Sequence, residues 1–141
     1  MVLDRKIAFI DLFTGMTEIK PISLDLRKKF LGGRGINMAL LSESYTRDLD
    51  PFSPDNPLIF GAGLLCGTLG FGSRISVTSK SPESGHLGDA NMGGDFGAEL
   101  VKAGFSHLVI TGKSPGPVYL LVENDSIEIR DAPNAEGPRH F

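Results

Sequence analysis

Two glycine-rich segments each combine adaptable backbone with a special polar side chain, a pattern typical of anion or cofactor binding. The first runs from Gly67 to Arg74 (GTLGFGSR), and the second runs from Ala90 to Gly97 (ANMGGDFG). Backbone N–H groups in such loops can surround a phosphate, and Arg74 can donate two parallel hydrogen bonds to it. Asn91 offers an amide, or a backbone carbonyl that can bind magnesium. The alternative is that both segments are tight turns and that Arg74 forms a salt bridge.

No other group of residues in the sequence forms a recognisable catalytic set. Neither segment matches the phosphate-binding motif G-x-x-x-x-G-K-[ST] or a dinucleotide-binding G-x-G-x-x-G that follows a strand. The three histidines are too scattered for a local metal pair, and His107, in a β-prone run, is interpreted as a core or interface residue. Ser73 and Ser84 lack an evident base, so nucleophilic catalysis is unsupported.

Four further polar or sulfur-containing residues are interpreted as follows. Asp89 is interpreted as a turn residue, and Asp95 as the N-cap of a helix. Cys66 follows an apolar strand and is interpreted as a small, buried hydrophobic residue. Arg34 lies between two glycines at the start of a predicted helix. There it either faces a ligand or forms a salt bridge.

The composition indicates one globular domain with an unusual share of glycine. The chain has 141 residues, of which 18 are glycine, and its formal net charge is −3. A nucleic-acid-binding domain would be strongly basic, and a membrane helix would need a run of about 20 apolar residues. The single cysteine excludes an internal disulfide and a self-contained zinc or iron–sulfur site. We therefore expect a cytoplasmic protein that binds neither nucleic acid nor membrane.

The remaining sequence predicts the elements that must position the two segments. Short apolar or alternating runs predict strands at 6–13, 16–22, 58–63, 74–79, 86–92, 106–112, 118–122 and 126–130, and helices are predicted at 24–31, 35–45 and 95–103. The residues expected to face the core are Ile36, Met38, Ala39 and Leu41 in the second helix, and Phe96, Leu100 and Val101 in the third. Because strands come as hairpins with helices between groups, the predicted class is α+β. We expect a mostly antiparallel sheet or barrel-like base with about three helices.

Several short motifs follow one another in a specific order along the chain. They are LGGRG at 31–35, DPFSPDNP at 50–57, GAGLLCGT at 61–68, SR at 73–74, TSKSP at 78–82, ANMGGDFGAEL at 90–100, GK at 112–113 and IEIRDA at 127–132. With these motifs, the chain from about residue 6 to residue 132 resembles the N-terminal domain of the tungsten-dependent aldehyde:ferredoxin oxidoreductase family.

The resemblance implies a redox role and a set of cofactor-binding residues. Members of this family oxidise aldehydes to carboxylic acids with a tungsten or molybdenum ion held by two pterin cofactors. An iron–sulfur cluster passes the electrons to ferredoxin, and a magnesium ion bridges the two pterin phosphates. By its place in the motifs, Arg74 matches an arginine between the cofactor and the cluster. Asn91 matches a residue whose backbone carbonyl binds magnesium, and Gly93 matches a glycine whose backbone contacts the pterin phosphate.

The sequence also departs from the family pattern. Family enzymes are several times longer, and their cluster cysteines, acid–base residues and substrate-binding residues lie downstream. We therefore expect residues 1–132 to be an incomplete N-terminal domain, followed by a loose tail at 133–141, that is not catalytically competent alone. Downstream domains or a partner chain would supply the missing parts. The alternatives are a non-enzymatic domain that self-associates through its sheet as a homodimer, and a small enzyme with its own chemistry.

Overall fold

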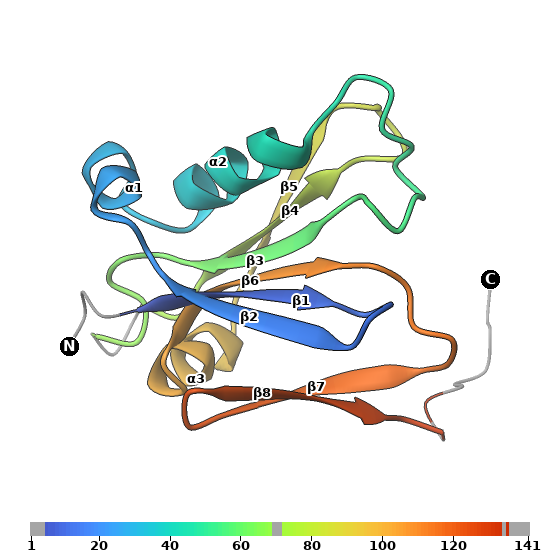
Figure 1. Ribbon diagram of the computed structural model, residues 1–141. Coiled ribbons are helices and arrows are strands. Elements are labelled where there is room, and N and C mark those ends of the chain that lie inside the picture. The colour runs from blue at the N-terminus through green and yellow to red at the C-terminus, as the bar shows by residue number, and fades with distance from the viewer. Residues whose placement is uncertain (1–4, 69–71, 134, 136–141) are drawn as a thin grey trace.

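The computed structural model describes residues 5–68, 72–133 and 135, which form eight strands and three helices (Figure 1). The strands are β1 (Lys6–Asp11), β2 (Met16–Pro21), β3 (Leu58–Ala62), β4 (Ile75–Lys80), β5 (Leu87–Met92), β6 (Phe105–Thr111), β7 (Val118–Glu123) and β8 (Ser126–Asp131). The helices are α1 (Leu24–Lys29), α2 (Arg34–Ser44) and α3 (Phe96–Lys102). Each predicted strand and helix is present, with ends shifted by a few residues.

A six-stranded sheet in the order β2-β1-β6-β3-β4-β5 lies at the centre of the fold. Neighbouring strands are antiparallel except for β1 and β6, which are parallel. Strands β7 and β8 form a separate hairpin. The predicted α+β class is confirmed. Of the two forms expected, a sheet or a barrel, the structure has an open sheet whose edges are β2 and β5.

The sheet is covered on both faces, so the molecule has three layers (Figure 1). Helices α1 and α2 lie on one face, while α3 and the β7–β8 hairpin lie on the other. The core under α2 consists of Ile7, Ile36, Leu40, Leu41, Ile59 and Val109. The core under α3 and the hairpin consists of Ala8, Ile10, Leu100, Phe105 and Leu108. Alternate residues of β1 therefore enter the two cores, as the period of a strand requires.

Turn residues connect the hairpins where the sequence predicts them. Gly15 has a φ of 72° between β1 and β2, a left-handed conformation that glycine adopts without strain. Asn124 and Asp125 have φ values of 49° and 64° between β7 and β8. Two successive positive φ values are typical of the tight turn that matches the twist of a hairpin. The local signals therefore fix these connections.

The buried face of α2 differs from the prediction. Its buried residues are Ile36, Asn37, Leu40 and Leu41, whereas Met38 and Ala39 are only partly buried. The cause is Asn37, which lies in the middle of the face that packs on the sheet. Its side chain forms hydrogen bonds there, so a polar residue occupies a position that the apolar pattern assigns to the solvent side.

The prediction for α3 is also partly wrong, because Phe96 is 43% exposed. Its ring lies 5.9 Å from the ring of Phe60, between centroids. The buried residues of this helix are Gly97 and Leu100. A Cβ at position 97 would lie 2.5 Å from the side chain of Ile75 and from the backbone oxygen of Ser73. The start of α3 therefore packs on the sheet through a glycine, and the preceding phenylalanine is turned aside.

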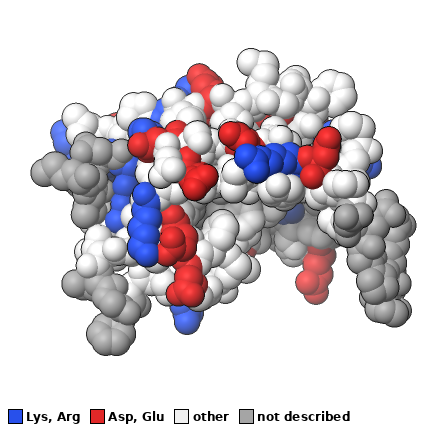
Figure 2. Space-filling view, turned by 90° about the horizontal axis from the view of Figure 1, so that it is seen from below, with Lys and Arg blue, Asp and Glu red and all other residues white. Residues whose placement is uncertain are grey.

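The charged side chains on the face that carries the β7–β8 hairpin are mixed in sign. Seen from below, lysine and arginine side chains lie next to aspartate and glutamate side chains rather than gathering into one field (Figure 2). Among the residues that the structure describes, no helix has the length and apolarity needed to cross a membrane.

Candidate functional site

The second glycine-rich segment begins within an edge strand rather than in a loop. Ala90, Asn91 and Met92 are the last residues of β5, and Asn91 lies opposite Ser76 of β4. This stretch lacks the β-branched residues that favour strands, so pairing with β4 decides its conformation. Because β5 is an edge strand, only one side of its backbone is used by the sheet.

The three residues predicted to bind a cofactor come together at one end of the β4–β5 pair. Ile75, the first residue of β4, lies opposite Met92, the last residue of β5. Arg74 directly precedes β4 and Gly93 directly follows β5, so the two leave the sheet side by side. Paired Cα atoms in antiparallel strands are about 4.5–5.5 Å apart. Arg74, Asn91 and Gly93 are all exposed.

Asp89 lies within β5, so its interpretation as a turn residue is wrong. Its carboxylate has one charged partner, Arg34, and one buried partner, Thr78. Its Oδ2 accepts a hydrogen bond from Nε of Arg34 at 2.7 Å and forms an ion pair with Nη2 of Arg34, also at 2.7 Å. Its Oδ1 accepts a hydrogen bond from the hydroxyl of Thr78 at 3.1 Å. The side chain of Asp89 is 10% exposed and that of Arg34 is 60% exposed. The salt bridge expected as one of two roles for Arg34 is therefore confirmed.

These residues define one exposed region at the start of α2 and the end of β5. We call it the β4–β5 corner, consisting of Arg34, Arg74, Asp89, Asn91 and Gly93.

Asn37 anchors the first turns of α2 beneath this region. Its Nδ2 lies 3.1 Å from the Thr78 hydroxyl, 3.1 Å from the Ser76 backbone oxygen and 3.3 Å from the Ile59 backbone oxygen. Asn37 is fully buried and Thr78 is 1% exposed. Because a buried amide without partners would be costly, this network fixes the start of α2 over β3 and β4.

Glycines allow the chain to bring the start of α2 close to β3. Gly32 and Gly33 have φ values of 124° and 51°, which few other residues adopt. Gly32 forms an isolated bridge with Gly63, and the Gly33 N–H donates to the Ala62 carbonyl at 3.0 Å. Arg34 is then the first residue of α2, which begins without a side-chain cap. Backbone geometry therefore places the arginine at the corner.

Gly93 has free space where a side chain would be. A Cβ built at this position meets no atom within 4 Å. The left-handed conformation belongs to its neighbour Gly94, with a φ of 88°. The described part of the fold therefore gives no packing or conformational reason for a glycine at position 93. Open space above an exposed backbone is what the close approach of a ligand requires.

The first glycine-rich segment is described only in part, because residues 69–71 lie outside the described residues. The N–H of Gly67 donates to the carbonyl of Gly72 at 2.7 Å, which closes the loop. Arg74 follows this closed loop. Binding of a phosphate by the loop itself stays a prediction.

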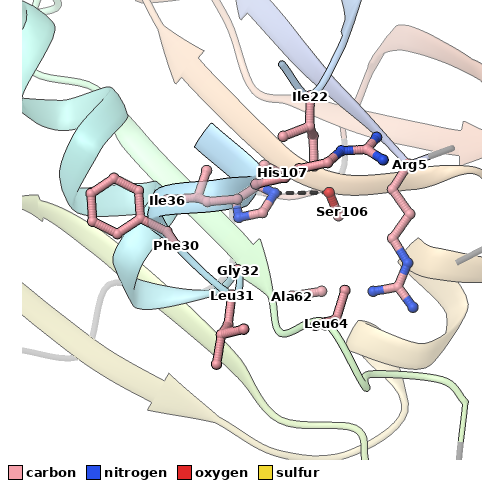
Figure 3. Close-up of a pocket in the computed structure, with 11 residues that line it drawn as sticks. Arg5, Ile22, Phe30, Leu31, Gly32, Ile36, Ala62, Leu64, Ser106 and His107 are labelled. Atoms are coloured by element: carbon pink, nitrogen blue, oxygen red, sulfur yellow. Dashed lines mark hydrogen bonds between the residues drawn. The ribbon is translucent and has the colours of Figure 1, made fainter. Parts of the chain in front are cut away.

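A cavity of about 110 Å³ lies between α1, the end of β3 and β6 (Figure 3). Its lining is mainly apolar and includes Phe30, Leu31, Ile36 and Leu64, together with several polar side chains. Figure 3 shows Arg5 on one side of the cavity and the Ser106–His107 pair on another. None of the five residues of the β4–β5 corner contributes to this lining.

Some polar groups around this cavity contact the protein itself, whereas Nε of Arg5, Nε of Arg27 and Nε2 of His107 are buried without a hydrogen-bond partner among the described residues. Arg5 donates from Nη1 to the Gly63 carbonyl at 2.9 Å and from Nη2 to the Cys66 carbonyl at 2.8 Å. Ser106 Oγ lies 2.8 Å from Nδ1 of His107. We refer to Arg5, Asn37, Ser106 and His107 as the buried polar cluster, because each is at most 6% exposed.

Burial also shifts the pKa values of two residues of reactive types, His107 and Cys66. It lowers the pKa of His107 to about 4, and the Arg5 guanidinium adds to this effect, while the nearby Gly33 backbone opposes it. His107 is therefore neutral at pH 7. Burial raises the pKa of the Cys66 thiol, and Arg5 partly counteracts this. Cys66 packs against Ala62 and Ile75, so its interpretation as a buried hydrophobic residue is confirmed.

The donor set of the corner suits an anion rather than a directly ligated transition metal. In residues 5–68, 72–133 and 135, no three His, Cys, Asp or Glu side chains gather in a way that could hold a metal ion. Both carboxylate oxygens of Asp89 already accept hydrogen bonds. What the corner offers is two exposed arginines and a glycine with open space. Guanidinium groups and free backbone N–H groups are typical partners of phosphate.

Sequence reasoning missed Asp89, Asn37 and Thr78. The alternation of a strand places Asp89 on the same face as Asn91, so this signal was available once 86–92 was assigned as extended. The pairing of Arg34 with Asp89 joins residues 55 positions apart, and no local pattern predicts it. The same holds for Asn37, whose partners lie on two distant strands.

The chain is similar to known oxidoreductases over nearly its whole length. A family model described as the N-terminal domain of aldehyde ferredoxin oxidoreductase matches residues 7–141. The tungsten-containing aldehyde ferredoxin oxidoreductase of Pyrococcus furiosus is 42% identical over 131 residues, covering 92% of this chain and 22% of that protein. The WOR-like subunit of an aliphatic sulfonate oxidoreductase from the same organism is 37% identical over 90% of this chain and 21% of its own length.

The fold is likewise similar to a solved structure. The active site complex BamBC of benzoyl coenzyme A reductase, in complex with 1,5-dienoyl-CoA, matches with a TM-score of 0.89 and 38% identity. The match covers 94% of this chain and 20% of that chain. The chain thus spans about a fifth of the length of the relatives that it matches. On the match to residues 7–141, this chain belongs to the aldehyde ferredoxin oxidoreductase family and corresponds to its N-terminal domain.

Proposed function

We propose that this chain is the cofactor-seating part of a tungsten or molybdenum bis-pterin oxidoreductase and that its β4–β5 corner binds the phosphate end of the cofactor. The observation that carries the proposal is the convergence of Arg74 with Asn91 and Gly93, which follow it by 17 and 19 positions, at one exposed end of two paired strands. The residues fit a phosphate-bearing group because a cation, an edge-strand backbone and an open glycine occur together.

Each of the three residues has a distinct role in this proposal. The guanidinium of Arg74 donates hydrogen bonds to the pterin and supplies a fixed positive charge beside it. The backbone carbonyl of Asn91 would hold a magnesium ion at the cofactor phosphates, since hard cations prefer oxygen ligands. The backbone of Gly93 contacts a phosphate, and the lack of a side chain lets the ligand approach it.

In the complete enzyme, the bound cofactor supplies the redox chemistry that converts an aldehyde to a carboxylic acid. An iron–sulfur cluster held by residues outside this chain would carry the electrons to ferredoxin. Among the described residues, no acid–base pair or nucleophile accompanies the corner. We therefore propose that this chain binds and orients the cofactor in the cytoplasm and that downstream domains or a partner chain complete the catalytic site.

In this proposal, residues outside this chain determine which substrate the complete enzyme accepts. Relatives that share this domain are named for an aldehyde, for aliphatic sulfonates and for glyceraldehyde-3-phosphate. A domain common to proteins with such different substrates is expected to serve what they share, which is the cofactor.

The proposal can be tested with magnesium and inorganic pyrophosphate, which present two linked phosphates to the corner. We expect calorimetry to show that the unmodified chain binds this probe. Binding should also shift the amide NMR signals of Gly93 and Gly94. Arg74→Ala should weaken binding about tenfold, which corresponds to about 1.4 kcal/mol. The melting temperature should stay nearly constant because an exposed arginine contributes little to stability. Unchanged affinity together with a melting temperature lower by several degrees would contradict the proposal.

Gly93→Val tests the backbone contact separately. The branched side chain occupies the space in which a phosphate would approach, so pyrophosphate binding should be lost. The free energy of unfolding should change by less than about 0.5 kcal/mol, as for most exposed substitutions. A variant that retains the affinity of the unmodified chain would remove Gly93 from the site.

The open sheet favours a second candidate, a non-enzymatic domain that pairs with a copy of itself. The exposed edge strand β5 ends the sheet, and its residues Leu87 and Met92 are 44% and 37% exposed. Unpaired strand edges are ready sites for association. Sedimentation equilibrium at micromolar concentrations distinguishes the two: a homodimer supports this candidate, and a folded monomer that binds magnesium pyrophosphate supports the first.

A further inference from the structure

We infer that Arg34 is an additional anion-binding residue of the β4–β5 corner and that Asp89 is the positioning residue that holds it in place. The inference rests on the proposed function, since it assigns two more residues to the same site. It extends the site from the ends of β4 and β5 to the first residue of α2.

The geometry of the Arg34–Asp89 pair leaves most of the guanidinium available. Two of its N–H groups, on Nε and Nη2, contact the same oxygen, Oδ2 of Asp89, at 2.7 Å. A guanidinium carries five N–H groups in a rigid plane. The Arg34 side chain is 60% exposed, so the remaining N–H groups face solvent. One carboxylate oxygen therefore fixes the direction of the group without using up its donors.

Asp89 is itself held firmly, which makes it suitable as a support. Its other oxygen, Oδ1, accepts a hydrogen bond from the Thr78 hydroxyl. Thr78 is 1% exposed, and its hydroxyl lies within hydrogen-bonding distance of the buried Asn37 amide. A series of hydrogen bonds thus runs from Asn37 of α2 through Thr78 of β4 to Asp89 of β5. A side chain held at both oxygens has little freedom to turn toward a metal ion.

Position also links the pair to the proposed cofactor residues. Asp89 precedes Asn91 by two residues, so both side chains project from the same face of β5. Their Cα atoms are about 6.5–7 Å apart at the rise of a strand. Asn37 contacts the Ser76 carbonyl, and Ser76 lies opposite Asn91. The start of α2 therefore lies over the end of the strand pair from which Arg74 and Gly93 emerge.

A purely structural role does not account for this arrangement. Ion pairs with an exposed partner contribute little to stability, and α2 is already fixed by Asn37 and by the contacts of Gly32 and Gly33 with β3. The salt bridge is thus not needed to keep the helix in place. Its effect is to fix the direction of the guanidinium beside Asp89.

The test uses magnesium with inorganic pyrophosphate as the probe, measured by calorimetry on the folded chain. We expect Arg34→Gln to weaken binding about tenfold and to make the remaining affinity less dependent on salt. Asp89→Asn should weaken binding by a smaller factor, about threefold, because the arginine keeps its charge but loses its fixed direction. Arg34→Lys should not restore full affinity, because an ammonium cannot contact Asp89 and a phosphate in the same planar arrangement.

A matched control is Lys29→Gln in α1, which removes one positive charge and one exposed salt bridge, with Asp25, and which is not a residue of the corner. Its affinity should stay within about twofold of the unmodified chain. Equal affinities for Arg34→Gln and Lys29→Gln would overturn the inference, as would full recovery in Arg34→Lys. Melting temperatures of all variants, measured in the absence of probe, separate loss of binding from loss of folding.

The outcomes also separate this inference from the proposed function. If Arg74→Ala weakens binding and Arg34→Gln does not, the corner binds the anion without Arg34 and only the inference fails. If the unmodified chain does not bind the probe at millimolar concentration, both the proposed site and the role of Arg34 are wrong. Loss of affinity in Arg34→Gln with an unchanged melting temperature supports both.

Discussion

The buried polar cluster and the β4–β5 corner use similar residue types in opposite environments. Arg5 in the cluster is 6% exposed and donates to two backbone carbonyls. Arg34 in the corner is 60% exposed and contacts a single carboxylate oxygen. The two terminal nitrogens of Arg5 therefore hold a strand and a loop together, whereas the guanidinium of Arg34 is held in place with exposed donors to spare. Burial and partner count, rather than residue type, separate the residues that build this fold from those available to a ligand.

Glycines in the two regions differ in the same way. A Cβ at Gly61 would overlap the amide of Asn37 and the ring of His107, so the fold requires the absence of a side chain there. A Cβ at Gly93 meets nothing within 4 Å. A glycine that packing requires is explained by the fold. A glycine that packing does not require points to something that approaches from outside.

The largest expected effect comes from Gly61→Ala. The added methyl group overlaps two fully buried side chains, and overpacking of this kind costs about 3 kcal/mol. Urea denaturation should show this loss in the free energy of unfolding. Gly93→Ala is the matched control and should change stability by less than about 0.5 kcal/mol. Equal stabilities of the two variants would show that the distinction between the glycines is wrong.

A second variant sharpens this prediction. Asn37→Ala removes one of the two groups that the new methyl would meet. The destabilisation caused by Gly61→Ala should therefore be smaller in the Asn37→Ala background than in the unmodified chain, since residues in contact are not additive.

Acid should destabilise the chain through His107. Its pKa is about 4 in the folded protein and about 6.5 when unfolded. The unfolded state therefore binds more protons between these values, and stability falls as the pH drops from about 6.5 to about 4. The full loss is about 3 kcal/mol, because one pKa unit corresponds to 1.36 kcal/mol.

The measurement is the free energy of unfolding between pH 7 and pH 4 for the unmodified chain and two variants. His107→Gln should show a smaller loss on acidification because the buried imidazole is gone. His86→Gln, at an exposed histidine, should show the same loss as the unmodified chain. A His107→Gln curve parallel to that of the unmodified chain would mean that His107 is not the acid-sensitive group.

The smallest expected change in the free energy of unfolding comes from replacing the two asparagines, Asn37 and Asn91. Asn37→Ala leaves the buried Thr78 hydroxyl with one partner fewer and should cost about 2 kcal/mol. Asn91→Ala should cost less than about 0.5 kcal/mol, because Asn91 is exposed. Since the proposed magnesium ligand is the backbone carbonyl, Asn91→Ala should also bind magnesium pyrophosphate within about twofold of the unmodified chain. A large loss of affinity would assign the role to the side chain instead.

Local signals predicted the elements well and the faces of the helices less well. The hairpin turns at Gly15 and Asn124 are set by the backbone preferences of the residues themselves. The inward face of α2 was predicted wrongly at Met38 because a buried Asn37 is recognisable only from its partners on β3 and β4. Phe96 was predicted to face inward, but it is 43% exposed, and Gly97 is buried against the sheet instead.

The sequence by itself determined the strands, the helices, the α+β class and the candidates Arg74, Asn91 and Gly93, because turn chemistry, periodicity and glycine spacing are local properties. Only the tertiary structure decided that these candidates meet at one end of β4 and β5. It alone joined Arg34 to Asp89 and buried His107 in a neutral state. Strand register and helix placement bring distant residues together, and they depend on the packing of the whole chain rather than on any segment of it.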